Sequence, residues 1–235
     1  MKFNKLILAV AFAAAALATA SCSDKEGQTG ITYYADIVLD GPTKAVAPAG
    51  TPFVDPGFTA TMQGKDVTDE VEVNTDMNLA SPQPGYYTIT YSLTNADGFT
   101  ASAVRYVLVT DPSDPISGYY TTAPDSYRDY NGQTYFGGYP VVVYGTGSDR
   151  YYVSDLLGGW YEYRAGYGAK YALTGEIAVA ADGSISLISS FLQGWADGAD
   201  YLEGAADTAA GKLSWTVGYA GMMAFNVVLD KDVNE

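Results

Sequence analysis

Residues 84–109 read "PGYYTITYSLTNADGFTASAVRYVLV", two runs of alternating side chains separated by a turn. In each run a large apolar residue is followed by a smaller or polar one, the period of two that is typical of a strand with one buried face. Between the runs, "NADG" at residues 95–98 is a sequence that closes a hairpin. The segment therefore predicts two antiparallel strands.

The same alternation recurs along the chain, and no segment has helical periodicity. The further runs are "VEV" (71–73), "GEIAVA" (175–180), "SISLIS" (184–189), "KLSWTV" (212–217) and "AFNVVL" (224–229). Turn sequences such as Asp97-Gly98 and Asp182-Gly183 punctuate them. We therefore predict an all-β protein.

A domain boundary is predicted at residues 111–115, which read "DPSDP". Two prolines within five residues interrupt a strand and stiffen a connector. Composition changes there, because 15 of the 21 tyrosines and all three tryptophans follow Pro115. We expect one domain over residues 31–110 and a second, Tyr/Gly-rich β domain over residues 116–235, which would hold any aromatic ligand platform.

The first half, residues 31–110, resembles a bacterial immunoglobulin-like (Ig-like) domain. The matching segments are "AGTPFVDPGFTAT" (49–61), "DVTDEV" (66–71) and the hairpin quoted above. The resemblance implies an Ig-like β-sandwich that acts as a spacer or an adhesive unit. Four acids, Asp55, Asp66, Asp69 and Glu70, could bind calcium at one end of the sandwich. Their irregular spacing favours solvated turn acids instead, so we assign no metal site.

The second half resembles the C-terminal domain of Bacteroidetes cell-surface lipoproteins of uncharacterised function. The segments that carry this resemblance are "VSDLLGGWYEYRAGYGAKYALTG" (153–175), "LQGWADG" (192–198) and "GKLSWTVGYAGMMAFNVVL" (211–229). The resemblance implies a role in handling carbohydrate at the cell surface. Six to eight strands in hairpin succession over about 120 residues fit a small antiparallel, lipocalin-like β-barrel or a sandwich. We favour the barrel, because neighbouring hairpins close a sheet without long crossovers.

The N-terminal residues predict a lipoprotein signal peptide over residues 1–21. Lys2 and Lys5 precede an apolar run at residues 6–18, which is too short to cross a bilayer. Cys22 follows Ala-Ser and is the only cysteine, so we expect its thiol to carry the lipid that anchors the chain to the membrane. An ordinary signal peptide with an accidental cysteine is the alternative. Residues 22–30 form a flexible tether, whose Asp24 and Glu26 resemble the export tag of surface lipoproteins, and we predict an outer-membrane, cell-surface location.

Charge and residue types exclude several functions. The mature chain keeps 10 of the 12 basic residues and all 27 acidic ones, a net charge of 10 minus 27, or −17. This charge argues against nucleic-acid binding. The chain has no histidine, which excludes Ser-His-Asp triads, Cys-His dyads and His-based zinc sites. No phosphate-binding loop is present, and we expect no cofactor.

Carboxylate chemistry of the kind that glycosidases use is the one catalytic option left. The acids available in the second half are Asp155, Glu162, Glu176, Asp197, Asp200 and Glu203. A chain with so many acids places some of them close together by chance. We therefore predict that the protein is not an enzyme and assign no catalytic residue.

A ligand site is predicted in the aromatic and glycine-rich run of the second domain. Its residues are Trp160, Tyr161, Tyr163, Arg164, Tyr167 and Tyr171. In a strand Tyr161 and Tyr163 would share one face and form a shelf for the apolar face of a sugar, with Arg164 orienting it. The alternative is that these tyrosines only cover the sheets. Trp195 and Trp215 are expected in the core.

These observations predict a non-catalytic, lipid-anchored surface protein that binds a glycan or a protein partner and is associated with polysaccharide uptake. One alternative is a structural or adhesive component of an outer-membrane complex that binds no small ligand. A second is a carboxylate-dependent glycosidase, and a third is a barrel that holds a small apolar ligand inside.

Overall fold

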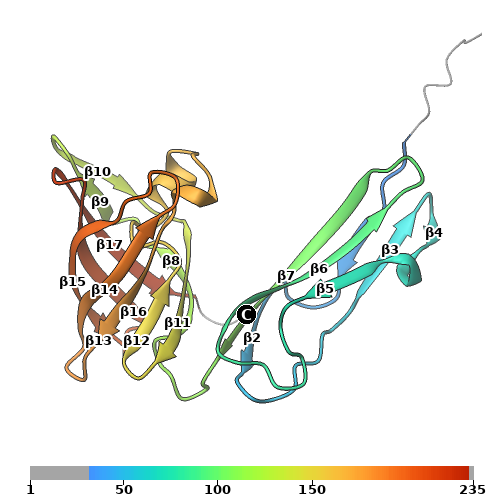
Figure 1. Cartoon of the computed structure of the whole chain (residues 1–235), viewed down its shortest axis with the longest axis horizontal. Helices are drawn as coiled ribbons and strands as arrows, with labels where there is room; N and C mark the ends of the chain where they lie inside the picture. The colour runs from blue at the N-terminus through green and yellow to red at the C-terminus, as the bar shows by residue number, and fades with distance from the viewer. Residues whose placement is uncertain (1–31, 233–235) are drawn as a thin grey trace, which may run out of the picture.

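The computed structural model describes residues 32–232, so the predicted signal peptide and the tether, including Cys22, lie outside the described part. The described chain is nearly all β, which confirms the predicted fold class. Two β domains lie side by side in Figure 1, the second formed by the strands from β8 onward. No helix within residues 32–232 is long and apolar enough to cross a membrane.

The first domain consists of two sheets, as the Ig-like resemblance implies. One sheet has the order β1 (Asp36–Leu39), β3 (Phe58–Met62), β4 (Lys65–Asp66), and the other β2 (Lys44–Pro48), β7 (Thr100–Thr110), β6 (Gly85–Thr94), β5 (Glu72–Thr75). A short 3-10 helix, η1 (Thr68–Glu70), precedes β5. The hairpin predicted from residues 84–109 is β6 and β7, paired from Gly85 with Val109 to Thr94 with Thr100.

The second domain is an eight-stranded antiparallel barrel with one extra hairpin, so the predicted barrel is confirmed. Its strands are β8 (Gly118–Thr122), β9 (Ser126–Asp129), β10 (Gln133–Phe136), β11 (Pro140–Gly147), β12 (Arg150–Val153), β13 (Leu173–Val179), β14 (Ser184–Leu192), β15 (Ala199–Asp207), β16 (Lys212–Tyr219) and β17 (Met223–Lys231). The end of β17 pairs with β8 and closes the barrel. The start of β17 pairs with β9, so the β9–β10 hairpin extends the wall beyond the barrel.

The barrel interior is packed with apolar side chains from every wall strand and from the segment between β12 and β13. Trp215 is buried there, and its Nε1 donates a hydrogen bond to the carbonyl of Leu156 at 2.8 Å, which confirms the prediction for this tryptophan. The prediction for Trp195 is wrong, because this side chain is 43% exposed. Trp195 lies in the tight turn between β14 and β15, where Ala196 has a φ of 56°.

Residues 154–172 cover one end of the barrel, which we call the mouth, and contain two short helices. These are the π-helix η2 (Trp160–Arg164) and the 3-10 helix η3 (Ala169–Tyr171). The expected strand with Tyr161 and Tyr163 on one face is therefore wrong. Gly158 and Gly159 adopt φ values of 63° and 84°, the left-handed region that glycine enters without strain, and they turn the chain into η2.

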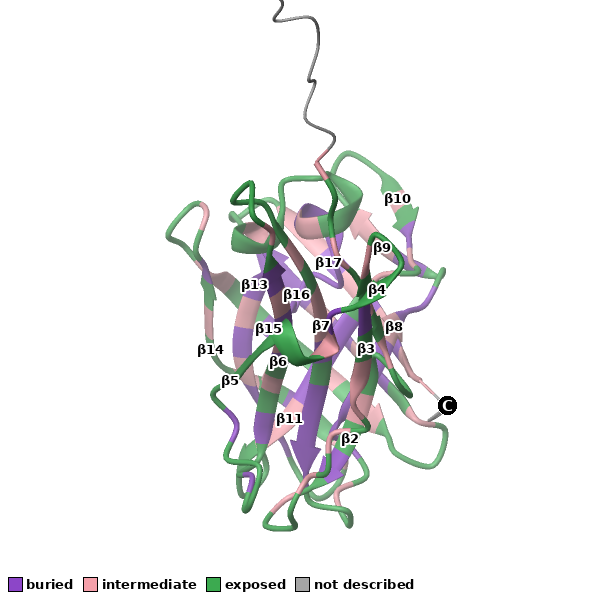
Figure 2. Ribbon diagram, turned by 90° about the vertical axis from the view of Figure 1, so that its right-hand side faces the viewer, coloured by how far each residue is buried: buried purple, intermediate pink, exposed green. Residues whose placement is uncertain are grey.

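The two domains pack through the outer face of the β6–β7 sheet. Leu108 of β7, Tyr119 of β8 and Val142 of β11 form a small buried cluster. The hydroxyl of Tyr119 donates to the carbonyl of Ala45 at 3.3 Å. Figure 2 shows buried segments along β7 and in the barrel strands behind it. The contact thus combines apolar packing with at least one cross-domain hydrogen bond.

Candidate functional site

Five aromatic rings meet at the mouth of the barrel, and we call them the mouth cluster: Tyr161, Tyr167, Tyr171, Trp195 and Tyr219. Trp195 contacts the rings of Tyr161 at 4.8 Å and Tyr171 at 4.9 Å between centroids, both edge to face. Tyr167 stacks on Tyr161 at 6.0 Å with an interplanar angle of 12°. Edge-to-face and offset arrangements at these distances are favourable. The rings therefore hold one another in fixed orientations.

The inner members of the mouth cluster are fixed from below. Tyr161 and Tyr219 are buried and belong to the barrel core. The hydroxyl of Tyr219 donates to both carboxylate oxygens of Asp197, at 2.8 and 2.9 Å. Burial, and then this carboxylate, raise the pKa of Tyr219, so its hydroxyl stays protonated at neutral pH. The outer members, Tyr167 at 53% exposure and Trp195 at 43%, face solvent on this support.

The six residues predicted from sequence are divided among three environments. Trp160 and Tyr161 are buried, at 3% and 8% exposure, and Trp160 packs edge to face on Phe136. The guanidinium carbon of Arg164 lies 4.2 Å from the Trp160 ring centroid, so Arg164 covers this ring. Tyr163 is exposed and stacks on Tyr139. Tyr167 and half-buried Tyr171 join buried Tyr161 in the mouth cluster, so three of the six meet there.

Sequence reasoning missed two members of the mouth cluster, Trp195 and Tyr219. For Trp195 a signal exists, because "GWADG" at residues 194–198 places the ring between glycines in a sequence typical of a turn. For Tyr219 no signal separates it from the other strand tyrosines, and only the β15–β16 pairing brings it to the mouth.

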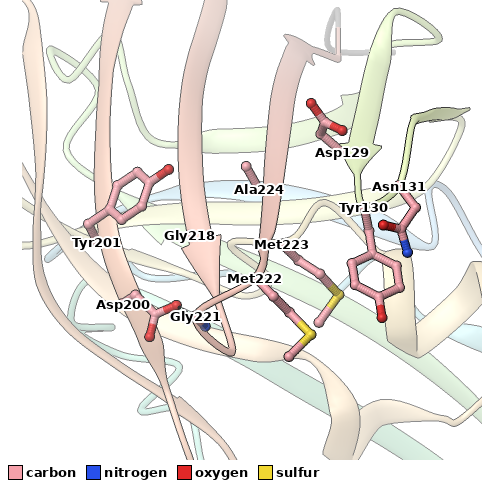
Figure 3. Close-up of a pocket in the computed structure, with 10 residues that line it drawn as sticks. All are labelled: Asp129, Tyr130, Asn131, Asp200, Tyr201, Gly218, Gly221, Met222, Met223 and Ala224. Atoms are coloured by element: carbon pink, nitrogen blue, oxygen red, sulfur yellow. Dashed lines mark hydrogen bonds between the residues drawn. The ribbon is translucent and has the colours of Figure 1, made fainter.

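A hollow of about 470 Å³ lies beside the mouth cluster, on the outer wall of the barrel. We call it the wall hollow. Figure 3 shows the ten residues that line it: Asp129, Tyr130, Asn131, Asp200, Tyr201, Gly218, Gly221, Met222, Met223 and Ala224. Met223 connects the two features, because the hydroxyl of Tyr161 donates to its Sδ at 3.6 Å.

Asp155 organises the mouth segment from inside. Its Oδ1 accepts the backbone N–H groups of Leu157 at 2.9 Å and Leu173 at 3.2 Å, and its Oδ2 accepts that of Gly159 at 3.0 Å. Because the carboxyl is fully buried, desolvation raises its pKa to about 7, against the opposing effect of these three donors. The nearby charge of half-buried Glu162 raises it further, and burial also raises the pKa of Glu162.

Four of the other acids considered for catalysis or calcium, Glu176, Asp200, Asp55 and Asp66, have structural partners. Glu176 accepts a hydrogen bond from the hydroxyl of Thr146 at 2.6 Å, and Asp200 accepts the backbone N–H of Gly221 at 2.7 Å. In the Ig-like domain, Asp55 pairs with Arg105, and Asp66 accepts the N–H of Thr68. Within residues 32–232 no group of three His, Cys, Asp or Glu side chains is placed to hold a metal ion.

The chain combines an Ig-like domain with an eight-stranded barrel, and a known family matches each part. A family described as bacterial surface protein, Ig-like domain, matches residues 37–109. A second family, described as a C-terminal domain, matches residues 110–231.

Comparison with solved structures identifies the family. The crystal structure of the lipoprotein BT2262 from Bacteroides thetaiotaomicron is 36% identical in sequence, and the match covers 84% of this chain and 100% of that one, with a TM-score of 0.76. The chain belongs to the family of this lipoprotein, and both resemblances described from the sequence are confirmed. No catalytic family is among these matches.

A second solved structure is more distant. It contains CBM51-2 in complex with GlcNAc and INT domains from Clostridium perfringens ZmpB, at 18% identity, covering 85% of this chain and 45% of that one. Its TM-score of 0.25 is below that of a shared fold. No curated protein matches the sequence.

Proposed function

We propose that this surface lipoprotein is a non-catalytic glycan-binding protein, and that its mouth cluster is the binding surface. The observation that carries this proposal is the exposure of Trp195 and Tyr167 at the barrel mouth, on a support of buried rings. A large apolar side chain whose only role is to fill the core is expected to be buried, not to lie in a turn that faces solvent. Their exposure at the end of a barrel is typical of a recognition surface.

The chemistry of the mouth cluster suits a sugar. A hexopyranose has an apolar C–H face and a polar rim, and an aromatic ring whose edge carries a hydroxyl complements both. Tyr167 and Tyr171 supply such rings around Trp195, with centroids 6.0 and 4.9 Å from it. Because the rings already contact one another, little side-chain entropy is lost when a ligand binds.

The arrangement of the acids supports binding without catalysis. Glu162 and Asp155 interact electrostatically, but Asp155 is 1% exposed and both its oxygens accept backbone N–H groups. A general acid or a nucleophile must reach the glycosidic bond, and Asp155 has no such access. The membership in a lipoprotein family supports the anchor that we predict at Cys22 and a location on the outer membrane facing outward. The Ig-like domain would then act as the spacer between the anchor and the barrel.

The experiment that tests the function is a titration of the mature protein with a panel of soluble polysaccharides, followed by tryptophan fluorescence and affinity gel electrophoresis. Trp160 and Trp215 are buried, so a ligand at the mouth cluster changes mainly the Trp195 emission. We expect a blue shift with at least one polysaccharide and its loss in W195A. The control variant F191A removes another exposed ring of similar exposure, on β14, and keeps the response. If no polysaccharide changes either the tryptophan emission or the mobility in the gel, the proposal that the mouth cluster binds a glycan is wrong.

A further inference from the structure

We propose that the wall hollow is a second sugar subsite, and that it takes a hexopyranose unit without acidic substituents. The inference rests on the proposed function in one respect, the glycan as ligand class, but it concerns a separate surface of the barrel. Glycan binding at the mouth cluster does not depend on this second subsite.

The strand register creates the wall hollow. Tyr201 of β15 pairs with Gly218 of β16, Gly218 with Ala224 of β17, and Ala224 with Asp129 of β9. Side chains opposite one another in a sheet point to the same face. In the next row Leu202, Val217 and Phe225 point into the barrel core, so the row from Tyr201 to Asp129 points outward. Its two central positions carry the smallest side chains, which leaves the depression.

The Tyr201 ring lies over Gly218 and forms one side of the wall hollow. A Cβ built on Gly218 would lie 2.2 Å from Cε1 of this ring, which only glycine permits in this arrangement. The ring is nevertheless 48% exposed, so it also presents surface to solvent. A flat, partly exposed ring beside a depression is a platform on which the C–H face of a sugar can stack. Figure 3 shows this ring at one side and Asp129, Tyr130 and Asn131 at the other.

The rim offers polar groups in fixed positions. Asp200 is held by the N–H of Gly221 at 2.7 Å, and Asp129 ends the paired part of β9. A carboxylate with a free lone pair accepts hydrogen bonds from sugar hydroxyls, and it attracts the ammonium group of an amino sugar. The volume of about 470 Å³ falls in the size range of small-molecule sites, roughly 300–1,000 Å³.

Charge determines which sugars are accepted. Two of the ten residues that line the wall hollow are acidic, and none of these ten is basic. A uronic acid or a sulfated sugar would place its negative charge next to Asp129 and Asp200, with no cation in the lining to pair with it. The net charge of −17 on the mature chain adds to this repulsion. Neutral and amino sugars carry no such penalty.

The test uses methionine methyl and tryptophan indole resonances of the mature protein as two separate reporters. Met222 reports on the wall hollow, and Trp195 reports on the mouth cluster. Met223 also lines the wall hollow but contacts Tyr161, so it responds to both surfaces. Met62 and Met77 of the Ig-like domain are internal controls. The probes are three hexasaccharides: cellohexaose, which is neutral, the glucosamine hexamer, which is cationic, and hexagalacturonate, which is anionic. We expect cellohexaose or the glucosamine hexamer to shift the Met222 methyl signal, while hexagalacturonate binds at least tenfold more weakly.

Two variants complete the design. Y201A removes the stacking ring, and A224T fills the floor with a residue that strands tolerate. Both should weaken the methyl response at least fivefold, whereas Y135A, which removes an exposed tyrosine of β10 outside the lining, should not. Shifts of Trp195 alone would overturn the wall subsite and leave the proposed function standing. A shift of Met222 without a shift of Trp195 would overturn glycan binding at the mouth cluster and leave the wall subsite standing. Equal binding of hexagalacturonate, or no shift with any probe, would overturn the inference.

Discussion

Nε of Arg105 lies 3.1 Å from Oδ1 of Asp55 inside the Ig-like domain, and the arginine side chain has no exposed surface. The same guanidinium donates to the backbone carbonyls of Asp40 at 2.8 Å and Gly57 at 3.0 Å, and to that of Pro42. Arg105 of β7 therefore fixes the loops that lead into the first sheet and out of it. Asp55, which the sequence analysis placed among solvated turn acids, is instead the partner of a fully buried arginine.

Replacement of Arg105 by methionine should lower the free energy of unfolding of the Ig-like domain. The change removes the positive charge that pairs with Asp55, whose carboxylate keeps only the Gly57 N–H and the Tyr91 hydroxyl as donors, and it removes one donor from each of the three loop carbonyls. Breaking a buried pair in this way costs about 3–5 kcal/mol. Urea unfolding followed by circular dichroism measures the loss. The control K212A breaks an ion pair with Asp230 whose side chains are both about half exposed, and it should leave the free energy of unfolding nearly unchanged. Equal decreases in the free energy of unfolding for the two variants would contradict the role of Arg105 in fixing these loops.

Asp155→Asn should lower both the stability of the barrel and the order of its mouth. The amide can accept the N–H groups of Leu157 and Leu173, but its own N–H₂ group would then face the N–H of Gly159. The N–H of Gly159 loses its acceptor and the buried N–H₂ group gains none. Each buried donor without an acceptor costs about 1–3 kcal/mol. Urea unfolding and the near-ultraviolet circular dichroism of the mouth aromatics measure the two effects. A variant as stable as the wild type would show that the mouth segment does not depend on this carboxyl.

The stabilising contribution of Asp155 should fall as the pH rises. Burial raises its pKa to about 7 in the folded protein, above the value of about 3.9 in an unfolded chain. Between these values the folded state binds more protons than the unfolded state, so the free energy of unfolding decreases with pH. The stability margin of the wild type over D155N, measured by urea unfolding at pH 5 and pH 8, should therefore be smaller at pH 8. If the stability margin grew with pH, the three N–H donors would lower the pKa of Asp155 more than burial raises it.

Gly194→Ala should disturb the mouth cluster without unfolding the barrel. A Cβ on Gly194 would lie 2.4 to 2.9 Å from atoms of the Tyr171 ring, which must move away and lose its contact with Trp195. We expect a shifted Trp195 emission and at least fivefold weaker glycan binding, with the free energy of unfolding changed by less than about 1 kcal/mol because the ring lies near the surface. The control is G147A, where a Cβ meets nothing within 4 Å. Unchanged emission in G194A would contradict the assigned contact.

Leu108→Ser should loosen the two domains while each stays folded. Leu108 is fully buried against Tyr119 and Val142 of the barrel, and loss of this apolar contact removes about 2–4 kcal/mol of packing. Small-angle scattering should show a larger radius of gyration, and nitrogen relaxation should show different tumbling times for the two domains. The control is V73S, because exposed Val73 of β5 pairs with Tyr91 of the sandwich core and so lies on the sheet face away from the barrel. Identical scattering of L108S and the wild type would show that the linker alone orients the domains.

Local patterns along the chain were sufficient for the fold class, for both family resemblances and for the barrel. Alternation of period two depends only on neighbouring residues, so it marks "KLSWTV" as a strand and places Trp215 inside. The absence of histidine and the single cysteine likewise exclude whole reaction classes, because those reactions need side chains that the chain does not contain.

The site itself depended on contacts between residues far apart in the chain. Trp195 and Trp215 are both tryptophans of the second half, and only the turn between β14 and β15 puts one of them in solvent. Tyr161 enters the core because η2 forms, and η2 forms where the carboxyl of Asp155 also holds the N–H of Leu173, 18 residues away. The wall hollow exists because four strands align Tyr201, Gly218, Ala224 and Asp129 in one row. No local pattern encodes these alignments, since the register is decided by the packing of the whole barrel.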